Sequence, residues 1–242
     1  MTSREDIEEA VRDGMRQACS DSLVFSEDET RQIDAEYLLT VNVAKSIAKL
    51  NTAFGDPYRI FAERQTRRFC DDCIPLVKRL PAADLIGRTD ILRTPGCNVS
   101  RNGRIDICIY RSRSGFDDVP VCAIELKRFG CTSQPAIDDL IRNSEYFGLS
   151  GPTGDSRIEF TVFGSLESYP KSLTQEDFER DLAAAKDFYT GLLKSLNPRA
   201  TFSANVDAFT VRSGLEVSDC DDGEKVLESN HHFAGVLVTF AR

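Results

Sequence analysis

Asp106, Glu125 and Lys127 are charged residues set in two strongly apolar segments of the chain. These segments, residues 104–110 and 119–127, are rich in β-branched residues and are separated by a polar loop, which predicts a β-hairpin. If the turn is centred in that loop, paired positions sum to about 231, and Asp106 lies opposite Glu125 with the Cβ atoms about 5 Å apart. Because side chains alternate along a strand, Lys127 shares a face with both carboxylates.

Two carboxylates placed this close repel each other unless a positive group lies between them. A divalent cation would remove the repulsion, and Mg²⁺ prefers one or two carboxylates, several waters and a phosphate oxygen. Lys127 could then hold or activate an attacking water, or stabilise charge that develops on a phosphate. The pattern therefore predicts Mg²⁺ or Mn²⁺ as cofactor and phosphoryl chemistry at the end of the hairpin.

This constellation resembles the PD-(D/E)xK nuclease superfamily, in which an Asp on one strand and a Glu/Asp-x-Lys on the next bind Mg²⁺ and hydrolyse phosphodiesters. Asp106 matches the Asp, and Glu125-Leu126-Lys127 matches the Glu-x-Lys. Many members add a Glu from a helix upstream of the core, and Glu36 fits that order. The resemblance spans residues 36–166. It implies catalytic roles for Asp106, Glu125, Lys127 and Glu36, with the metal bound by Asp106, Glu125 and Glu36.

A Glu-x-Lys triplet is short, and about one is expected by chance in a chain of this size. The context of this triplet strengthens the prediction. It is the only Asp/Glu-x-Lys in the chain, it ends an apolar strand, and a helix is expected after it from Ser133. Ile105 stands where the superfamily's name-giving Pro would be, and Asp90, in a similar Gly-Arg-x-Asp sequence, is a rival metal ligand. The alternative interpretation is a surface ion-pair cluster on a sheet edge, with Glu36 on a solvated helix flank.

The charge of the chain is unevenly distributed. Its 242 residues include 30 Lys and Arg against 39 Asp and Glu, and this net charge of −9 argues against nonspecific nucleic-acid binding. Residues 57–130 nevertheless hold 14 basic and 9 acidic residues, a net of +5. An anionic ligand could meet this basic segment, or its arginines could pair with the surplus acids. The first 36 residues, with 4 Arg against 11 acids, favour a protein partner.

Hydrophobic periodicity predicts an alternation of helices and strands. Helices are expected from Ser3, from residues 26–29 to about Leu50, from Ser133 to Gly148 and from Thr174 to Asn197; strands are expected at 58–69, 104–110, 119–127, 157–166, 201–212 and 233–240. In the second helix the expected main apolar stripe is Ile33, Tyr37, Val41, Ala44 and Ala48, with a second line at Glu36, Thr40, Val43 and Ile47. This order predicts an α/β fold with a mixed central β-sheet flanked by helices. The resemblance refines it to a restriction-endonuclease-like core.

Other chemistries have weaker support. Cys70 and Cys73 have zinc-like spacing, but a closed zinc site needs four ligands and no second pair is present. His231 and His232 have no nearby partner motif, and the chain contains no Gly-x-Ser-x-Gly elbow. The longest near-apolar run, residues 233–241, is too short for a membrane helix, and the acidic start is unlike a secretory signal. The eight cysteines are therefore expected to be reduced thiols in a cytoplasm.

The sequence predicts a single domain over residues 1–242, with an acidic N-terminal helix in 1–30, a nuclease-like core in 31–166 and a C-terminal helix and strands in 167–242. The resemblance implies a metal-dependent nuclease acting on nucleic acid, with DNA the expected substrate, in restriction, phage defence or mobile-element biology. The alternative is an inactive nuclease-fold module that binds or regulates a protein partner, with a homodimer also open. No membrane partner is expected, and the choice between DNA and RNA stays open.

Overall fold

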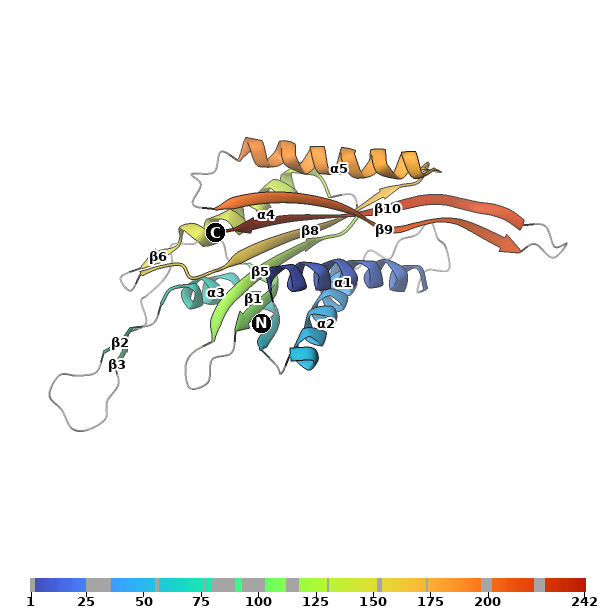
Figure 1. Ribbon diagram of the computed structural model, residues 1–242. Coiled ribbons are helices and arrows are strands. Elements are labelled where there is room, and N and C mark those ends of the chain that lie inside the picture. Colours follow the sequence, from blue (N-terminus) through green and yellow to red (C-terminus); the bar gives the residue numbers. More distant parts are fainter. Residues whose placement is uncertain are drawn as a thin grey trace.

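A six-stranded mixed sheet with helices on both faces organises the protein, as the computed structural model shows (Figure 1). The predicted α/β class is confirmed at this level. The structure describes residues 3–24, 36–54, 57–75, 77–79, 90–92, 103–111, 118–129, 131–151, 154–172, 174–196, 202–219 and 225–242.

The strand order in the sheet is β1-β4-β5-β8-β10-β9. The strands are β1 (Tyr58–Gln65), β4 (Arg104–Arg111), β5 (Val119–Lys127), β8 (Phe160–Tyr169), β10 (Lys225–Ala241) and β9 (Ser203–Asp219). Only β5 and β8 pair in parallel, and the other neighbours are antiparallel. Two short pairs lie outside this sheet: β2 (Val77–Arg79) with β3 (Asp90–Leu92), and β6 (Ser150–Gly151) with β7 (Gly154–Asp155).

The predicted hairpin register is confirmed over the centre of β4 and β5. Ile107 pairs with Ile124, Cys108 with Ala123 and Ile109 with Cys122, so each pair sums to the expected value of about 231. The register shifts after Ile109, and the turn itself lies outside the described residues. Strand β5 is buried along nearly its whole length, as expected of a central strand covered on both faces.

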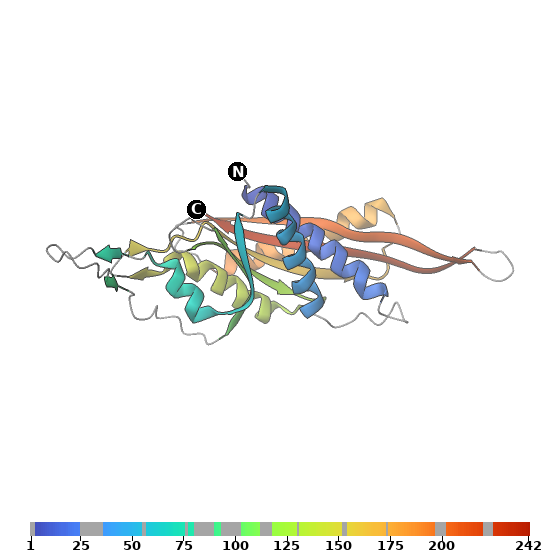
Figure 2. The ribbon, with the colours of Figure 1, turned by 90° about the horizontal axis from the view of Figure 1, so that it is seen from below.

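Alternation along the strands divides the core between two faces of the sheet. The first face, with Ile107, Ile124 and Leu126, is covered by α1 (Arg4–Val24) and α2 (Glu36–Phe54). The second face, with Cys108 and Ala123, is covered by α3 (Thr66–Cys73), α4 (Ser133–Glu145) with the 3₁₀ turn η1 (Tyr146–Gly148), and α5 (Gln175–Ser195). Figure 2, seen from below, shows α1 and α2 crossing each other over the first face.

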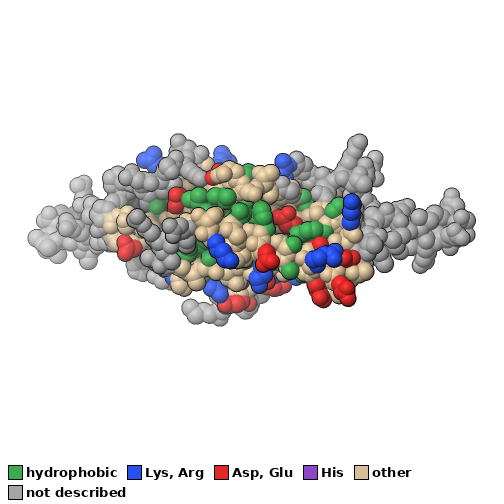
Figure 3. All heavy atoms as spheres, turned by 90° about the horizontal axis from the view of Figure 1, so that it is seen from above, with side chains coloured by type: hydrophobic (Ala, Val, Ile, Leu, Met, Phe, Trp, Pro, Cys, Tyr) green, Lys and Arg blue, Asp and Glu red, His purple; other side chains and the backbone are tan. Residues whose placement is uncertain are grey.

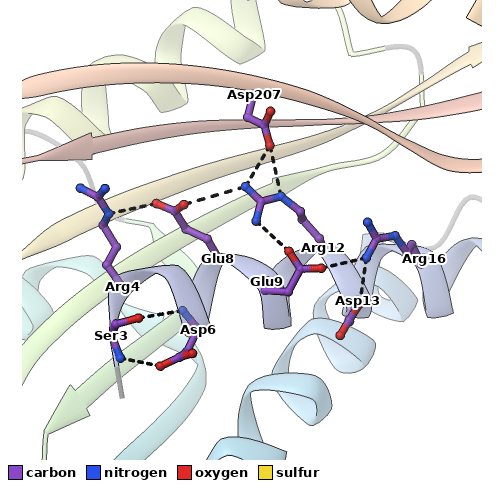
Figure 4. A network of polar contacts seen from close by, with 9 residues as sticks. All are labelled: Ser3, Arg4, Asp6, Glu8, Glu9, Arg12, Asp13, Arg16 and Asp207. Atoms are coloured by element: carbon purple, nitrogen blue, oxygen red, sulfur yellow. Dashed lines mark hydrogen bonds and ion pairs between the residues drawn. The ribbon is translucent and has the colours of Figure 1, made fainter. Parts of the chain in front are cut away.

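Helix α1 begins as the sequence predicts and fixes the place of α2. The Ser3 hydroxyl accepts the Asp6 N–H at 3.2 Å, and the Asp6 carboxylate accepts the Ser3 N–H at 2.7 Å, which forms a capping box (Figure 4). The helix then crosses α2 at Gly14, where an added Cβ would lie 2.4 Å from the Val43 Cα. This close approach requires glycine, and it sets the position of α2, whose first residue is Glu36.

The expected main apolar stripe of the second helix is wrong. Leu39, Val43 and Ile47 are buried, whereas Tyr37 is 73% exposed. The sequence offered two lines of apolar residues on this helix, and the crossing with α1 selects the line that runs through Val43. Because Glu36 begins that line, it lies toward the sheet. Residues 25–35, which include Ile33 and the expected helix start, lie outside the described residues.

Other element boundaries also differ from prediction. The strand expected at 58–69 ends at Gln65, and Thr66 begins helix α3 instead, with its N–H donated to the Gly103 carbonyl at 2.9 Å. The helix buries Phe69, Cys70 and Cys73 on one side, which is helical rather than strand periodicity. The two C-terminal strands are also longer than expected, and Figure 1 shows their hairpin extending past the other strands.

In the part of the chain that the structure describes, no helix is both long and apolar enough to cross a membrane. The six cysteines described there, Cys19, Cys70, Cys73, Cys108, Cys122 and Cys131, are all free thiols.

Candidate active site

Asp106 and Glu125 lie on the second face of the sheet at the same end of the hairpin. Both continue the confirmed register, since each lies one position beyond the Ile107–Ile124 pair on its own strand. The Asp106 carboxylate accepts the Leu126 N–H at 2.7 Å, which fixes its orientation across the two strands. The Glu125 side chain is only 2% exposed. The hairpin therefore brings together the two carboxylates that the sequence predicts.

Lys127 ends β5 beside Ser165 of the parallel neighbour β8. Its Nζ lies 3.1 Å from Glu36 Oε1 and 3.0 Å from Asp139 Oδ2. Glu36 reaches it from the first turn of α2, and Asp139 from α4 on the second face. The structure thus places all four predicted residues in one region, and Glu36 contacts the lysine rather than the other carboxylates.

Arg142 on α4 is the partner of Glu125. Its Nη1 lies 2.6 Å from Glu125 Oε1, and its Nη2 lies 2.9 Å from Asp139 Oδ1. A continuous chain of opposite charges therefore runs from Glu125 through Arg142, Asp139 and Lys127 to Glu36. The alternative interpretation, a surface ion-pair cluster on a sheet edge, is confirmed as far as the ion pairs of Glu125 and Lys127 are concerned, but its placement is wrong, because β5 is an interior strand and Glu125 is buried.

The cluster carries more negative than positive charge. Four carboxylates (Glu36, Asp106, Glu125 and Asp139) face two cations (Lys127 and Arg142), which leaves a formal charge of −2. Burial raises the pKa of Asp106 to about 6, although the Leu126 N–H and Lys127 oppose the shift. Burial also raises the pKa of Glu125, and the Asp106 charge acts in the same direction against Arg142. The Asp106 charge thus acts on Glu125, whereas the neighbouring charges that raise the pKa of Asp106 are those of Glu36 and Glu63.

Lys127 keeps its proton in this environment. Burial alone would lower its pKa, but Asp139 and Glu36 outweigh burial and hold the pKa above its ordinary value. A permanently charged ammonium is a poor general base. It is well suited to hold a water or to stabilise negative charge on a phosphate oxygen.

Within the described residues, no three Asp, Glu, His or Cys side chains form a ready cage for a metal ion. The donor set of Asp106 and Glu125 nevertheless fits Mg²⁺ or Mn²⁺, which are hard cations that take one or two carboxylates and keep several waters. Both carboxylates are on the second face, and burial is the main cause of their raised pKa values. A full protein cage would suit Ca²⁺ better.

Sequence reasoning missed Asp139, Arg142 and Glu63. The first two lie on α4, whose buried side contains Ala136, Asp139, Leu140 and Asn143. Polar residues at core-facing helical positions are a signal that the sequence carries. Glu63 lies opposite Asp106, between the Ala62–Ile107 and Arg64–Ile105 pairs of β1 and β4. It is the only described residue other than glycine with positive φ, at 54°.

The rival candidates lie elsewhere. Asp90 is on β3, in a two-stranded sheet separate from the main one. Cys70 and Cys73 are buried in the apolar core of the second face, where they pack with Phe69. Gln134, at the start of α4, is exposed and donates its side-chain amide to Asp138.

His232 has a partner that the sequence did not reveal. Its Nδ1 lies 3.0 Å from Asp181 Oδ2, and its Nε2 lies 3.1 Å from Thr210 Oγ1. The Asp181 carboxylate also accepts the Ser172 hydroxyl. Although this resembles a triad in composition, His232 is fully buried and stacks near Phe178, so it connects α5 to the β9–β10 hairpin away from solvent.

The basic segment is partly neutralised by its own neighbours. Arg59 pairs with Asp118, Arg64 with Asp72 and Arg111 with Glu159. These pairs fit the interpretation that the arginines offset surplus acids. Three others, Arg67, Arg68 and Arg104, are exposed around the end of the sheet that holds Asp106.

Comparisons of the chain with protein-family models, with curated proteins and with solved structures gave no match. The functional conclusion therefore depends on the geometry of the cluster and on the motif.

Proposed function

We propose that the protein is a divalent-metal-dependent nuclease that hydrolyses phosphodiester bonds, with Asp106, Glu125 and Lys127 as its centre. The observation that carries this proposal is the placement of the buried Glu125 carboxylate and the partly buried Asp106 carboxylate beside an anchored lysine ammonium, at the end of strand β5. Ligands of α/β sheets commonly bind at the carboxyl ends of parallel strands, and β5 ends here while its parallel neighbour β8 continues to Tyr169. A restriction-endonuclease-like core belongs to the same proposal.

Each residue has a distinct part in this mechanism. Asp106 and Glu125 would hold the cation, which when bound would supply Lewis-acid stabilisation of the phosphate charge. Lys127 donates hydrogen bonds to the attacking water or to a phosphate oxygen, and its contribution is greatest where negative charge develops. Glu36 and Asp139 accept from the lysine Nζ and hold it in position, since both lie within 3.1 Å. Glu36 is thus a positioning residue in this arrangement.

The substrate proposed is nucleic acid, with DNA expected and RNA an outcome of the test. The exposed arginines near the site, Arg67, Arg68 and Arg104, could contact phosphates. The face seen in Figure 3 is a less suitable platform, because its described Lys, Arg, Asp and Glu side chains are interspersed. We therefore place the nucleic acid at the end of the sheet rather than across α5.

An inactive binding module is the second candidate. It is favoured by one observation, namely that Glu125 and Lys127 are already satisfied by Arg142, Asp139 and Glu36 without a metal. In such a module the cluster would be structural, and the acidic N-terminal region would meet a protein partner or a second copy. Divalent-metal binding without cleavage would distinguish this candidate from a nuclease.

The test is cleavage of labelled single-stranded DNA, duplex DNA and RNA by the purified full chain. We expect cleavage of at least one substrate with Mg²⁺ or Mn²⁺, none with EDTA, and poor support by Ca²⁺. Glu125→Gln and Lys127→Ala should each lower the rate by at least about 100-fold, since each removes stabilisation of the transition state. Glu145→Gln, on the exposed side of α4, is the matched control and should cleave normally. Activity that survives chelation, or an unimpaired Glu125→Gln variant, would contradict the proposal.

A further inference from the structure

Whenever the Glu125 carboxylate is ionised, it needs a positive charge beside it. Its side chain is 2% exposed, and a carboxylate buried this deeply is costly unless it is paired. In the structure, the Arg142 guanidinium meets that need with Nη1 at 2.6 Å from Oε1. A divalent cation on the same carboxylate would lie next to the guanidinium, and the two positive charges would repel each other. Arginine and metal are therefore alternatives at Glu125.

Arg142 has a second partner that lets it leave Glu125 without becoming unpaired. Asp139 lies three residues earlier on the same helix, is 6% exposed, and accepts from Nη2 at 2.9 Å. The Arg142 side chain is not fully satisfied by its present contacts, because its buried Nε has no hydrogen-bond partner in the described structure. The guanidinium is therefore held through Nη1 and Nη2 but not through Nε, which suits a side chain that moves between two sets of contacts.

Charge balance points the same way. Among the described residues, Asp106 forms no ion pair, and its carboxylate is held by the Leu126 N–H. Glu36, Asp106, Glu125, Asp139, Lys127 and Arg142 together have a formal charge of −2, and Glu63 adds a further negative charge near Asp106, so a divalent cation between Asp106 and Glu125 would offset most of the excess. With that cation in place, Arg142 is no longer needed at Glu125 and is still matched by Asp139.

We propose that Arg142 is an internal counter-ion, which holds Glu125 in the metal-free protein and competes with the divalent cation for it. This inference rests on the proposed function, because it takes Glu125 to be a metal ligand. Metal binding transfers Arg142 to Asp139 alone. Arg142 therefore lowers the affinity for metal while it keeps Glu125 in the right rotamer, and the site engages only at a sufficient metal concentration.

The test is calorimetric titration of Mn²⁺ into the full chain, at one pH, for the wild type and four variants. Arg142→Met removes the competing charge and should tighten Mn²⁺ binding by about tenfold or more. Arg142→Lys keeps a charge but loses the fork, so it should tighten binding by less. Glu125→Gln should abolish binding. Arg12→Met is the matched control, because Arg12 also connects carboxylates, and two of its three partners, Glu9 and Asp207, are exposed.

The outcomes separate the two proposals. Unchanged or weaker Mn²⁺ binding in both Arg142 variants, with binding lost in Glu125→Gln, would overturn the counter-ion role and leave the metal site intact. Absence of Mn²⁺ binding in the wild type and in every variant would overturn the metal site itself. Circular dichroism establishes that each variant is folded, and if Arg142→Met is not, Arg142→Lys alone decides. Binding that tightens equally in Arg12→Met would contradict the inference, because a general loss of positive charge would then be the cause.

Discussion

Two arginines each connect carboxylates in different surroundings: Arg142 contacts two, and Arg12 contacts three, the third being Glu8 at 3.9 Å. Arg12 on α1 lies 3.0 Å from Glu9 and 2.9 Å from Asp207, and these partners are 55% and 42% exposed (Figure 4). Water can replace either partner at such a surface, and salt screens the attraction. This surface network therefore adds little to stability and can be altered without consequence for the fold.

The contacts of Arg142 have nearly the same lengths, yet its partners Glu125 and Asp139 are 2% and 6% exposed. Water cannot reach a buried carboxylate that loses its cation, so the cost of breaking the pair is large. The buried cluster also has a formal charge of −2. The comparison teaches that the distances alone do not distinguish the two networks: burial of the partners and the unmatched charge do.

The largest effect expected is on the free energy of unfolding when one carboxylate partner of each arginine is neutralised. Asp139→Asn removes the negative charge that pairs with both Arg142 and Lys127, and we expect it to lower the free energy of unfolding by about 3 kcal/mol. Asp207→Asn breaks the Arg12 contact at the surface and should cost under about 1 kcal/mol. Urea unfolding of both variants, with equal m values, measures the difference. Equal losses would mean that burial does not distinguish the two networks.

The next effect is the pH dependence of the stability, which has opposite signs for Asp106 in the buried cluster and for Glu9 in the surface network. The pKa of Asp106 is raised to about 6 in the folded protein, so its contribution is favourable at low pH and is lost as the pH rises through about 6. Without metal, stability should fall by on the order of 2 kcal/mol over that rise, and Asp106→Asn should lessen the fall without abolishing it, because the pKa of Glu125 is raised as well. Urea unfolding in EDTA, repeated at intervals of about one pH unit from mildly acidic to mildly alkaline solution, provides the measurement.

Glu9 provides the contrast at the surface. Burial alone would raise its pKa, but hydrogen bonds from Arg16 and Arg12 hold the pKa below its ordinary value. Its contribution is therefore present at neutral pH and lost as the solution becomes acidic, which is opposite to Asp106. A Glu9→Gln variant that altered the fall seen near pH 6 would contradict this assignment.

The smallest effect expected is on salt dependence. At about 1 M salt the screening length is only ~3 Å, so the small stability difference between Asp207→Asn and the wild type should disappear. The difference for Asp139→Asn should persist, because its partners are buried. Repeating the urea titrations at low and high salt provides the measurement. If the stability difference between Asp139→Asn and the wild type also vanished at high salt, solvent would have to enter the cluster.

The sequence was informative where structure is local. The hairpin of β4 and β5 follows from alternating residues on two adjacent segments, so the shared face of Asp106 and Glu125 could be predicted from those two segments alone. The capping box of α1 and that of α5, where Thr174 and Asp177 bond reciprocally, are equally local. In each case the interacting residues are close in sequence or related by a single turn.

Prediction from the sequence failed where contacts between distant segments determine the structure. Arg142 reaches Glu125 only because α4 packs on the second face, and no spacing rule on one segment reveals that contact. The buried side of α2 depends on the crossing at Gly14, which lies on another helix. The change from strand to helix at Thr66 is accompanied by a bond to Gly103, from the segment that leads into β4. Such information lies in tertiary packing, which overrides local preference.

The strand order also has a consequence for how fast the chain can fold. Hairpins such as β4–β5 close short loops and can form within microseconds. The centre of the sheet is different, because β8 pairs with β5 only after the crossover through α4, and with β10 only after the chain has passed through α5 and β9. The contact of Arg12 with Asp207 joins residues 195 positions apart. A topology with so many distant pairings has a high contact order, and the slow step is expected to be the docking of the β9–β10 hairpin onto β8.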